Sequence, residues 1–383
     1  MNQSKKIRVA VLYGGRSGEH EVSLSSATNV IQNLDRNRFE VVPVGIDKEG
    51  VWFLGDDVLK KELNDSGNVR LSRDIERMLF NPDLIGKTMQ CVQPASLFSQ
   101  AKKAERIFDV IFPVIHGTLC EDGTVQGLLE LTEVPYVGCG VLSSAIGMEK
   151  DISKRLVKNA GIRVADYRVI NRGQWDKNAA SFCQMVAVEL GFPVFVKPAN
   201  TGSSVGVEKI KRAEDLVSAI NTAFCYDTKI IVEQGIDAIE LEVAVLESQD
   251  YGADPIVSVV GEVRPAHEFY SYAAKYLDEN GAELLIPASI PSELQLHVQQ
   301  VAKMIFNVLE CEGMARVDLF LERGTNEIYF NEINTIPGFT QISMYPKLMS
   351  ASGVRYSELL THLILLAIAR HARKSQLSRE YVA

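Results

Sequence analysis

The residues best suited to chemistry lie in two neighbouring apolar segments near the end of the chain. Arg316-Val317-Asp318 lies in one predicted strand, and Asn331-Glu332-Ile333-Asn334 lies in the next. Because side chains alternate between the two faces of a strand, Arg316 and Asp318 share a face, as do Glu332 and Asn334. Two carboxylates and an amide on one face are oxygen donors that suit Mg²⁺. An exposed sheet face with an ion pair between Arg316 and Glu332 fits the same spacing equally well.

A second group of residues is a lysine followed by a loop of small side chains. Lys197-Pro198 ends a predicted strand, and Gly202-Ser203-Ser204-Val205-Gly206 follows it. Small residues let backbone N–H groups approach phosphate oxygens, and the preceding lysine adds a positive charge. The Walker A pattern G-x-x-x-x-G-K-[ST] is absent. A hairpin turn that binds nothing is the alternative interpretation.

Two further loops follow predicted strands. In the segment from Gly14 to Glu21 the glycines run G-G-x-x-G, which does not match the dinucleotide-binding pattern. A carboxylate such as Glu19 at this end of a strand can hold an amine, although a solvated loop charge is the alternative. His116 follows a later strand, where a structural histidine is the alternative to a catalytic one, and Glu121 and Asp122 are candidate helix caps.

Alternating strands and helices are expected to position the first set of loops. Apolar runs at 7–13, 41–46 and 107–115 predict strands, and residues 24–34 have the spacing of a helix. This alternation predicts a parallel sheet with right-handed crossovers. Residues 56–104 are polar and irregular, and no chemistry is assigned to them.

The pattern changes near residue 140. A helix over 148–161 ends at Gly161, and a strand, the Gly/Ser loop and further strands and a helix follow it as a small α+β unit. Strands at 239–247 and 256–263, a helix at 293–309 and a strand pair at 315–322 and 327–334 form a third unit. We therefore expect three domains, covering residues 1–139, 140–234 and 235–383.

The overall composition excludes several classes of protein. The chain has 383 residues and a formal charge of −9, which argues against nucleic acid or an anionic membrane as the main partner. Its six cysteines form no C-x-x-C or zinc-like cluster, as is typical of a reducing cytosol. No apolar run reaches the length needed to span a bilayer, so a cytoplasmic protein is expected.

Taken together and in order, the motifs resemble those of the D-alanine–D-alanine ligases, a family of the ATP-grasp superfamily. The resemblance covers nearly the whole chain. It rests on these segments: GGRSGEHEVSLSSA, HGTLCEDGTVQGLLE, MEKDISKRL, FVKPANTGSSVGV, IIVEQG, AAKYLDENG, MARVDLF and NEINTIPGFTQISMYPKL. It implies a combined α/β and α+β architecture, an ATP-grasp fold with an N-terminal Rossmann-like parallel-sheet domain.

The resemblance also implies roles for single residues. Those matched to ATP are Lys150, Lys197, Glu233, Glu240 and Phe269. Those matched to the metal are Asp318, Glu332 and Asn334. The catalytic set comprises Glu19, Ser203, Tyr276, Arg316 and Gly338, and His116, Lys275 and Ser343 are matched to further substrate contacts. ATP and Mg²⁺ are the implied cofactors, with two ions expected and Mn²⁺ as a substitute, and the family implies a homodimer.

The implied reaction agrees with the residue types. ATP converts one D-alanine carboxylate into an acyl phosphate, which the amine of the second D-alanine attacks. Positive charge and positioning are the main requirements of phosphoryl transfer. Because the intermediate hydrolyses readily, the loops 202–206 and 265–287 are expected to act as lids that are mobile without nucleotide and ordered with it.

Three positions depart from the usual family pattern: Cys120 in place of glycine, Ala273-Ala274 before Lys275, and Ile239 in place of arginine. The rival functions are ligation of D-alanine to D-serine or to a hydroxy acid, and a nucleotide-binding regulator with a degenerate site. Tyr276 favours the dipeptide over the depsipeptide, and the intact Arg316 and Asp318 argue against the regulator. An oxidoreductase that binds a nicotinamide cofactor is excluded by the glycine spacing.

Overall fold

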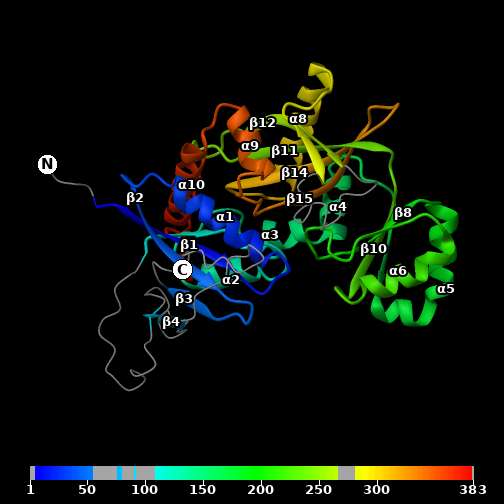
Figure 1. Cartoon of the computed structure of the whole chain (residues 1–383), viewed down its shortest axis with the longest axis horizontal. Helices are drawn as coiled ribbons and strands as arrows, with labels where there is room; N and C mark the ends of the chain where they lie inside the picture. The colour runs from blue at the N-terminus through cyan, green and yellow to red at the C-terminus, as the bar shows by residue number, and fades with distance from the viewer. Residues whose placement is uncertain (1–4, 55–75, 80–89, 92–107, 266–280, 382–383) are drawn as a thin grey trace.

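The computed structural model describes residues 5–54, 76–79, 90–91, 108–265 and 281–381, and its elements form three sheets with flanking helices (Figure 1). The first sheet has the strand order β5-β4-β3-β2-β1-β6. Its strands are β1 (Ile7–Gly14), β2 (Phe39–Ile46), β3 (Trp52–Leu54), β4 (Glu76–Leu79), β5 (Gln90–Cys91) and β6 (Val110–Pro113). β1 pairs with β2 and β6 in parallel, as predicted, and the apolar run of β1 is buried on both faces.

The sheet is mixed rather than wholly parallel. β3, β4 and β5 extend it in antiparallel fashion through a stretch of chain for which no strands were predicted. The strand expected from 107 to 115 is shorter and covers only β6. Helix α1 (His20–Asn33) packs on β1, and α2 (Thr124–Leu131) and α3 (Val141–Met148) follow β6.

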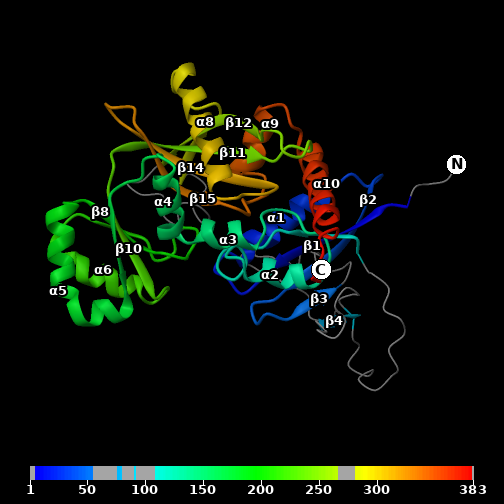
Figure 2. The same ribbon diagram turned by 180° about the vertical axis from the view of Figure 1, so that it is seen from behind.

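The second sheet is antiparallel, with the order β7-β10-β8-β9. Its strands are β7 (Tyr167–Asn171), β8 (Val194–Pro198), β9 (Glu208–Ile210) and β10 (Lys229–Gln234). Helices α5 (Arg172–Glu189) and α6 (Leu216–Ala223) cover one face, at the end of the molecule farthest from the C-terminal helix (Figure 2). The helix predicted over 148–161 is α4 (Lys150–Asn159), and Gly161 follows it with a φ of +84°, as a C-terminal glycine should.

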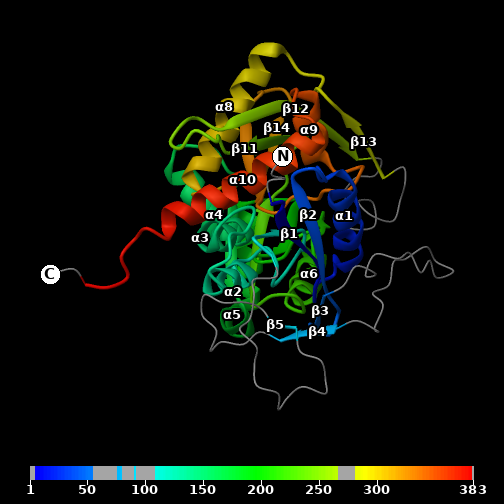
Figure 3. The same cartoon turned by 90° about the vertical axis from the view of Figure 1, so that its left-hand side faces the viewer.

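The third sheet is antiparallel, with the order β13-β12-β11-β14-β15. Its strands are β11 (Ala238–Leu246), β12 (Ile256–Pro265), β13 (Ala282–Leu285), β14 (Met314–Glu322) and β15 (Ile328–Asn334). Helix α8 (Ser292–Val308) packs on β12 and β11, α9 (Met344–Ala351) packs on the same two strands, and α10 (Tyr356–Lys374) ends the fold. Figure 3 shows α10 passing between this sheet and the first one.

The apolar cores do not follow the three sheets one to one. One core combines β1, α1 and β6 with α9 and α10, so the first sheet and the C-terminal helices share it. The second sheet has its own core between its strands and helices α5 and α6. The first core contains residues from both ends of the chain, so it does not separate the first predicted domain from the third. The predicted boundaries at residues 139 and 234 therefore stay a prediction.

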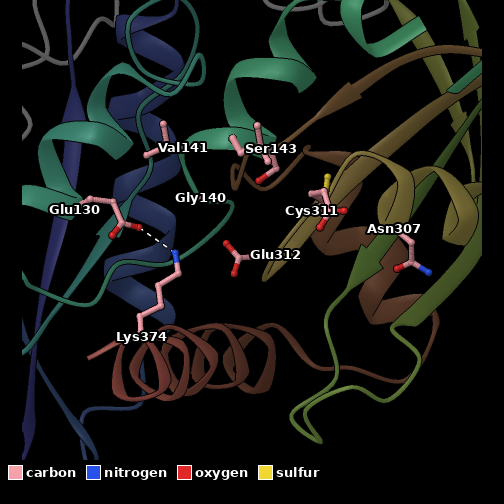
Figure 4. A pocket seen from close by; sticks show the side chains of 10 residues that line it. Glu130, Gly140, Val141, Ser143, Asn307, Cys311, Glu312 and Lys374 are labelled. Atoms are coloured by element: carbon pink, nitrogen blue, oxygen red, sulfur yellow. Dashed lines mark hydrogen bonds and ion pairs between the residues drawn. The ribbon is translucent and has the colours of Figure 1, made fainter. Parts of the chain in front are cut away.

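Helix α10 is also joined by polar contacts to the segment between α2 and α3 and to the residues just before β14. The buried Arg370 donates to the backbone oxygens of Tyr136 at 2.7 Å and Gly138 at 2.6 Å, and lies 3.2 Å from Glu312. Glu312 also lines a cavity of about 540 Å³, together with Cys311 and with the Glu130–Lys374 ion pair on one side of it (Figure 4). None of the predicted site residues lines this cavity. Among the helices in the described ranges, none has the length and apolar character needed to cross a membrane.

Candidate active site

The register of the third sheet brings the predicted metal ligands side by side. Asp318 on β14 lies opposite Glu332 on β15, and Arg316 lies opposite Asn334. The pairing is interrupted by a bulge just after Asp318, and bulges of this kind commonly redirect side chains beside functional sites. Asp318 is 8% exposed, and the other three residues are partly buried. The shared face predicted from the alternation is therefore confirmed, and it is not an exposed surface.

Arg316 contacts two carboxylates on this face. Its Nε and Nη2 donate to the two carboxylate oxygens of Asp318, each at 2.7 Å, and its Nε lies 3.1 Å from Oε2 of Glu242. Burial disfavours the charged guanidinium, but the charges of Asp318 and Glu242 outweigh this effect and raise the pKa of Arg316. The predicted alternative pairing of Arg316 with Glu332 is not the one observed, because Asp318 on the same strand offers both of its oxygens to the guanidinium fork.

Lys150 joins helix α4 to the metal-ligand face. Its Nζ lies 3.4 Å from Oε2 of Glu332 and donates to the backbone oxygen of Thr201 at 2.6 Å. Thr201 precedes the Gly/Ser loop, in which Ser203, Ser204 and Gly206 all have positive φ angles. A single ammonium group thus connects α4, the small-residue loop and β15, which are far apart in the sequence.

Lys197 on β8 occupies a second charged cluster, on the face of the second sheet that α5 and α6 leave open. Its Nζ lies 2.6 Å from Oε2 of Glu233 on β10, whose other oxygen lies 2.5 Å from Nζ of Lys154. Glu233 is 2% exposed and Lys154 is fully buried. Burial raises the pKa of Glu233, but the two lysines outweigh burial and lower it. Glu233 raises the pKa of Lys197 against the effect of burial.

The first strand-end loop meets the Gly/Ser loop at Glu19. The hydroxyl of Ser203 donates to Oε1 of Glu19, which is 7% exposed. His116 lies close by, since its backbone oxygen accepts from the hydroxyl of Ser17 at 2.6 Å, and the N–H of Glu19 donates to that same hydroxyl. The structure therefore brings together three of the residues expected at the first substrate position, from segments centred on 19, 116 and 203.

The ring of His116 is fixed on both sides. Its Nδ1 lies 3.1 Å from the backbone oxygen of Ile336 and 3.4 Å from Oε1 of Glu121, and its Nε2 lies 3.1 Å from the hydroxyl of Ser26. Burial raises the pKa of Glu121 to about 7. Burial would lower the pKa of His116, but the hydrogen bond and charge of Glu121 raise it. Glu121 therefore orients the ring and is not a helix cap.

The remaining described site residues lie around these clusters. Glu240 is on β11, two residues from Glu242, and its charge acts on Lys197. Ser343 precedes α9, and its hydroxyl accepts from the N–H of Thr340 at 3.0 Å. A Cβ atom at Gly338 would lie 2.7 Å from that hydroxyl, so only glycine fits there without displacing Ser343. Phe269, Lys275 and Tyr276 lie outside the described residues, as does most of the predicted lid 265–287.

Three residues of the site were not predicted from the sequence: Lys154, Glu242 and, as a histidine partner, Glu121. Lys154 lies four residues after Lys150, so the helical period would have placed both on one face. Glu242 lies two residues after Glu240, and strand alternation would have placed it on the same face. Cys120, which stands in place of the family's usual glycine, is 3% exposed, and burial raises the pKa of its thiol to about 12, as expected of an inert thiol.

The residues present fit a divalent cation of the Mg²⁺ type. Asp318, Glu332 and Asn334 supply only oxygen atoms, which is the donor set that Mg²⁺ prefers, and they are cross-strand or same-face neighbours. Within the described part of the chain, no group of three or more His, Cys, Asp or Glu side chains converges as a metal site. The remaining coordination positions would fall to phosphate and water.

Comparison with known proteins supports one family. The model of the D-Ala–D-Ala ligase N-terminus matches residues 8–139, and that of the C-terminus matches residues 156–365. The chain is 50% identical to a D-alanine–D-alanine ligase A from Bradyrhizobium diazoefficiens, over 99% of each chain. It is 48% identical to a D-alanine–D-alanine ligase from Caldicellulosiruptor bescii, over 97% of this chain and 98% of the relative.

Solved structures agree with this assignment. The D-alanine–D-alanine ligase from Coxiella burnetii superposes with a TM-score of 0.80 at 33% identity, over 97% of each chain. The VanG D-Ala:D-Ser ligase from Enterococcus faecalis superposes with a TM-score of 0.78 at 34% identity, over 95% of this chain and all of that one. With both family models matched and relatives of 48% and 50% identity over nearly the whole chain, the chain belongs to the D-alanine–D-alanine ligase family.

Proposed function

We propose that this protein ligates two molecules of D-alanine to D-alanyl-D-alanine at the expense of ATP, through a D-alanyl phosphate intermediate, for peptidoglycan synthesis. The observation that carries the proposal is the 3.4 Å contact between Lys150 and Glu332. It joins the residue matched to the ATP phosphates to a residue matched to the metal. Family membership over both halves of the chain supports the same reaction.

ATP is assigned to the region between the second and third sheets. Lys150 and Lys197 are the proposed phosphate ligands, because both are buried lysines beside this region. Lys150 lies next to the metal-ligand face, and Lys197 lies on the open face of the second sheet. Glu233 is the proposed adenine-side residue and Glu240 the proposed ribose ligand, and Phe269 is the proposed aromatic contact. A lysine whose pKa is raised, as that of Lys197 is, remains charged at neutral pH and can bind phosphate.

Asp318, Glu332 and Asn334 are the proposed ligands of Mg²⁺. When bound, the ion would neutralise phosphate charge and polarise the transferring phosphoryl group. We propose two ions per site, and Mn²⁺ as an active substitute, because its coordination preferences are close to those of Mg²⁺. Arg316, fixed by Asp318 and Glu242, is the proposed ligand of the first D-alanine carboxylate and of the charge that develops when the second amine attacks.

The first D-alanine is assigned to the meeting point of three loops. Glu19 would receive its ammonium group, with Ser203 and Tyr276 as hydrogen-bonding partners of that carboxylate. His116 would line the same position, and the backbone N–H of Gly338 would donate to the reacting carboxyl. Lys275 and Ser343 would bind the carboxylate of the second D-alanine. The loop 202–206 and the segment 265–287 would close over the intermediate and exclude water, although residues 282–285 of that segment form strand β13 and are not loop as expected.

A second candidate function is ligation of D-alanine to D-serine. The similarity to the VanG D-Ala:D-Ser ligase structure supports this second candidate, since the two chains superpose over nearly their whole length. The second-substrate residues Lys275 and Tyr276, on which the choice depends, lie outside the described part of the chain. A hydroxyl group changes affinity strongly only where a site is built to bond it, so the two substrates must be compared directly.

Two wider features complete the proposal. We place the protein in the cytoplasm, because ATP is the phosphoryl donor and the cysteines show no disulfide framework. A homodimer is proposed from the family, and equilibrium sedimentation would test it directly. A purely monomeric protein at micromolar concentration would exclude the dimer.

The reaction is tested by mixing the protein with ATP, Mg²⁺ and single or paired amino acids. Phosphate release and product mass would be measured with D-alanine, L-alanine, D-serine plus D-alanine, and D-lactate plus D-alanine. We expect phosphate release with D-alanine alone and a product with the mass of D-alanyl-D-alanine. Product only from mixed substrates would instead support the D-serine or hydroxy-acid alternative. Nucleotide binding without turnover of any D-amino acid would overturn the substrate assignment.

A further inference from the structure

Helix α4 carries two buried lysines, Lys150 at its first position and Lys154 one turn later. Lys154 is fully buried, whereas Lys158, one turn later, is exposed. Its Nζ lies 2.5 Å from Oε1 of Glu233 and 3.3 Å from the backbone oxygen of Phe330 on β15, and 5.7 Å above the centre of the Phe330 ring. Helix α4, β10 and β15 therefore meet at a single ammonium group.

Glu233 is shared by two lysines of unequal freedom. Lys154 is enclosed on all sides and anchored to β15, while the side chain of Lys197 is 11% exposed on the open face of the second sheet. Burial lowers the pKa of Lys154 against the attraction of Glu233, and the nearby charge of Lys197 lowers it further. Departure of Lys197 would relieve that repulsion and leave the Lys154–Glu233 pair intact.

This arrangement matters when nucleotide binds. Under the proposed function, the ammonium of Lys197 leaves Glu233 for the phosphates of ATP. A buried carboxylate that loses its partner is strongly destabilised, because no water replaces the lost charge. After Lys197 leaves, Glu233 would be a buried carboxylate without an ion-pair partner unless a second cation stayed beside it.

We propose that Lys154 is a positioning residue of the ATP site, the permanent counter-ion of Glu233 that frees Lys197 to bind phosphate. Lys154 touches neither ATP nor D-alanine in this scheme and acts only through Glu233. Its anchoring to Phe330 keeps the carboxylate at a constant position between the second and third sheets. The inference rests on the proposed function, since it requires ATP phosphates as the new partner of Lys197.

The proposal is tested with five variants that separate charge from packing. Lys154→Met removes the charge but keeps an unbranched chain of similar length, Lys154→Arg keeps the charge, and Lys158→Met is the matched control on the exposed face. Glu233→Gln removes the charge that needs neutralising, alone and combined with Lys154→Met. The affinity for a non-hydrolysable ATP analogue with Mg²⁺, the KM for ATP and kcat would be measured, with thermal melting to verify folding.

We expect Lys154→Met to weaken analogue binding by about tenfold or more and to raise KM for ATP more than it lowers kcat. Lys154→Arg should recover part of the loss, and Lys158→Met should match the wild type. In the Glu233→Gln background, Lys154→Met should change affinity by less than about threefold, because no buried charge remains unpaired.

Equal losses of affinity in both Glu233 backgrounds would show that Lys154 acts through packing and would overturn the proposal. Wild-type affinity in Lys154→Met would overturn it as well. A failure of the proposed function is distinguishable, because it would appear in the unmodified protein as absence of D-alanine-dependent phosphate release.

Discussion

Arg316, Lys150 and Lys197 each contact a carboxylate in a part of the protein from which water is largely excluded. These contacts hold the cationic side chains near the positions where anionic substrates are proposed to bind. Because each cation already has a partner, substrate binding exchanges one ion pair for another and does not desolvate a free charge. Partner residues such as Glu242, which contacts Arg316, and Lys154, which contacts Glu233, therefore fix the positions of the charged groups proposed to bind substrate.

The guanidinium geometry of Arg316 gives a prediction at this scale. Arg316→Lys replaces a planar fork that spans Asp318 and Glu242 with a single point charge. We expect kcat/KM for D-alanine to fall by about 10²-fold or more, through loss of charge stabilisation in the attack step. Steady-state phosphate release would measure it. Arg323→Lys, in an exposed pair with Asp237, is the control, and equal rates in both variants would contradict the role of Arg316.

The pKa of Glu121 gives a second prediction. Burial raises this pKa from 4.5 to about 7. At pH values between 4.5 and 7, Glu121 therefore keeps its proton in the folded state and has lost it in the unfolded state. Stability should therefore fall as pH rises from about 4.5 to 7, by up to about 1.4 kcal/mol per pH unit from this group. Glu121→Gln should flatten the decline, as urea unfolding at several pH values would show. An unchanged slope would mean that Glu121 is ionised throughout.

The sequence predicts residue types at this scale better than it predicts partners. Strand alternation correctly placed Arg316 with Asp318 and Glu332 with Asn334. It did not show which carboxylate Arg316 would contact, because that depends on side-chain rotamers and on a neighbouring strand, β11. Lys154 reads as an ordinary surface lysine in the segment KDISKR, and only the packing of α4 under β15 makes it a buried charge.

At the scale of elements, a glycine constrains the backbone of the loop between β8 and β9. Gly206 has a φ of +71°, and a Cβ atom there would lie 2.6 Å from the ring of Tyr226 and 2.9 Å from Pro198. The exposed Tyr226 can move aside, but Pro198 is buried in β8. The path of the Gly/Ser loop is thus tied to the strand that carries Lys197.

Gly206→Ala should therefore destabilise the loop and raise the KM for ATP several-fold. The matched control is Gly252→Ala, which has a φ of +84° but no atom within 4 Å of the added Cβ. It should lose only the cost of a left-handed alanine, about 1–2 kcal/mol, without any change in KM. Urea unfolding and initial rates would measure both variants. Matching KM values in the two would show that the contact with Pro198 does not shape the ATP site.

Most long elements were predicted correctly, and the errors have a physical origin. The periodic segments of α1, α4, α8, β11, β14 and β15 match their predicted ranges within a few residues. β3, β4 and β5 were missed because short edge strands depend on pairing with their neighbours more than on their own residue pattern. The expected mobility of the two lids stays a prediction, which limited proteolysis with and without ATP would test.

At the scale of the whole molecule, the first sheet depends on the C-terminal helix. Arg370→Ala should lower the free energy of unfolding by about 3 kcal/mol, because two backbone oxygens and Glu312 lose a buried partner. Lys374→Ala, which removes only a half-exposed pair with Glu130, should cost about 1 kcal/mol or less. Urea unfolding followed by tryptophan fluorescence would compare them. Equal effects would mean that α10 docks mainly through its apolar face.

The shared core of β1, α1, β6 and α10 has a consequence for how the protein is made. The first sheet leaves the ribosome early, but α10 follows it only after about 240 further residues have been added, from Pro113 to Tyr356. At about 5–20 residues per second, this interval lasts on the order of tens of seconds. During this interval the apolar surface that α10 will cover stays exposed, so we expect chaperones to bind the unfinished chain at this stage.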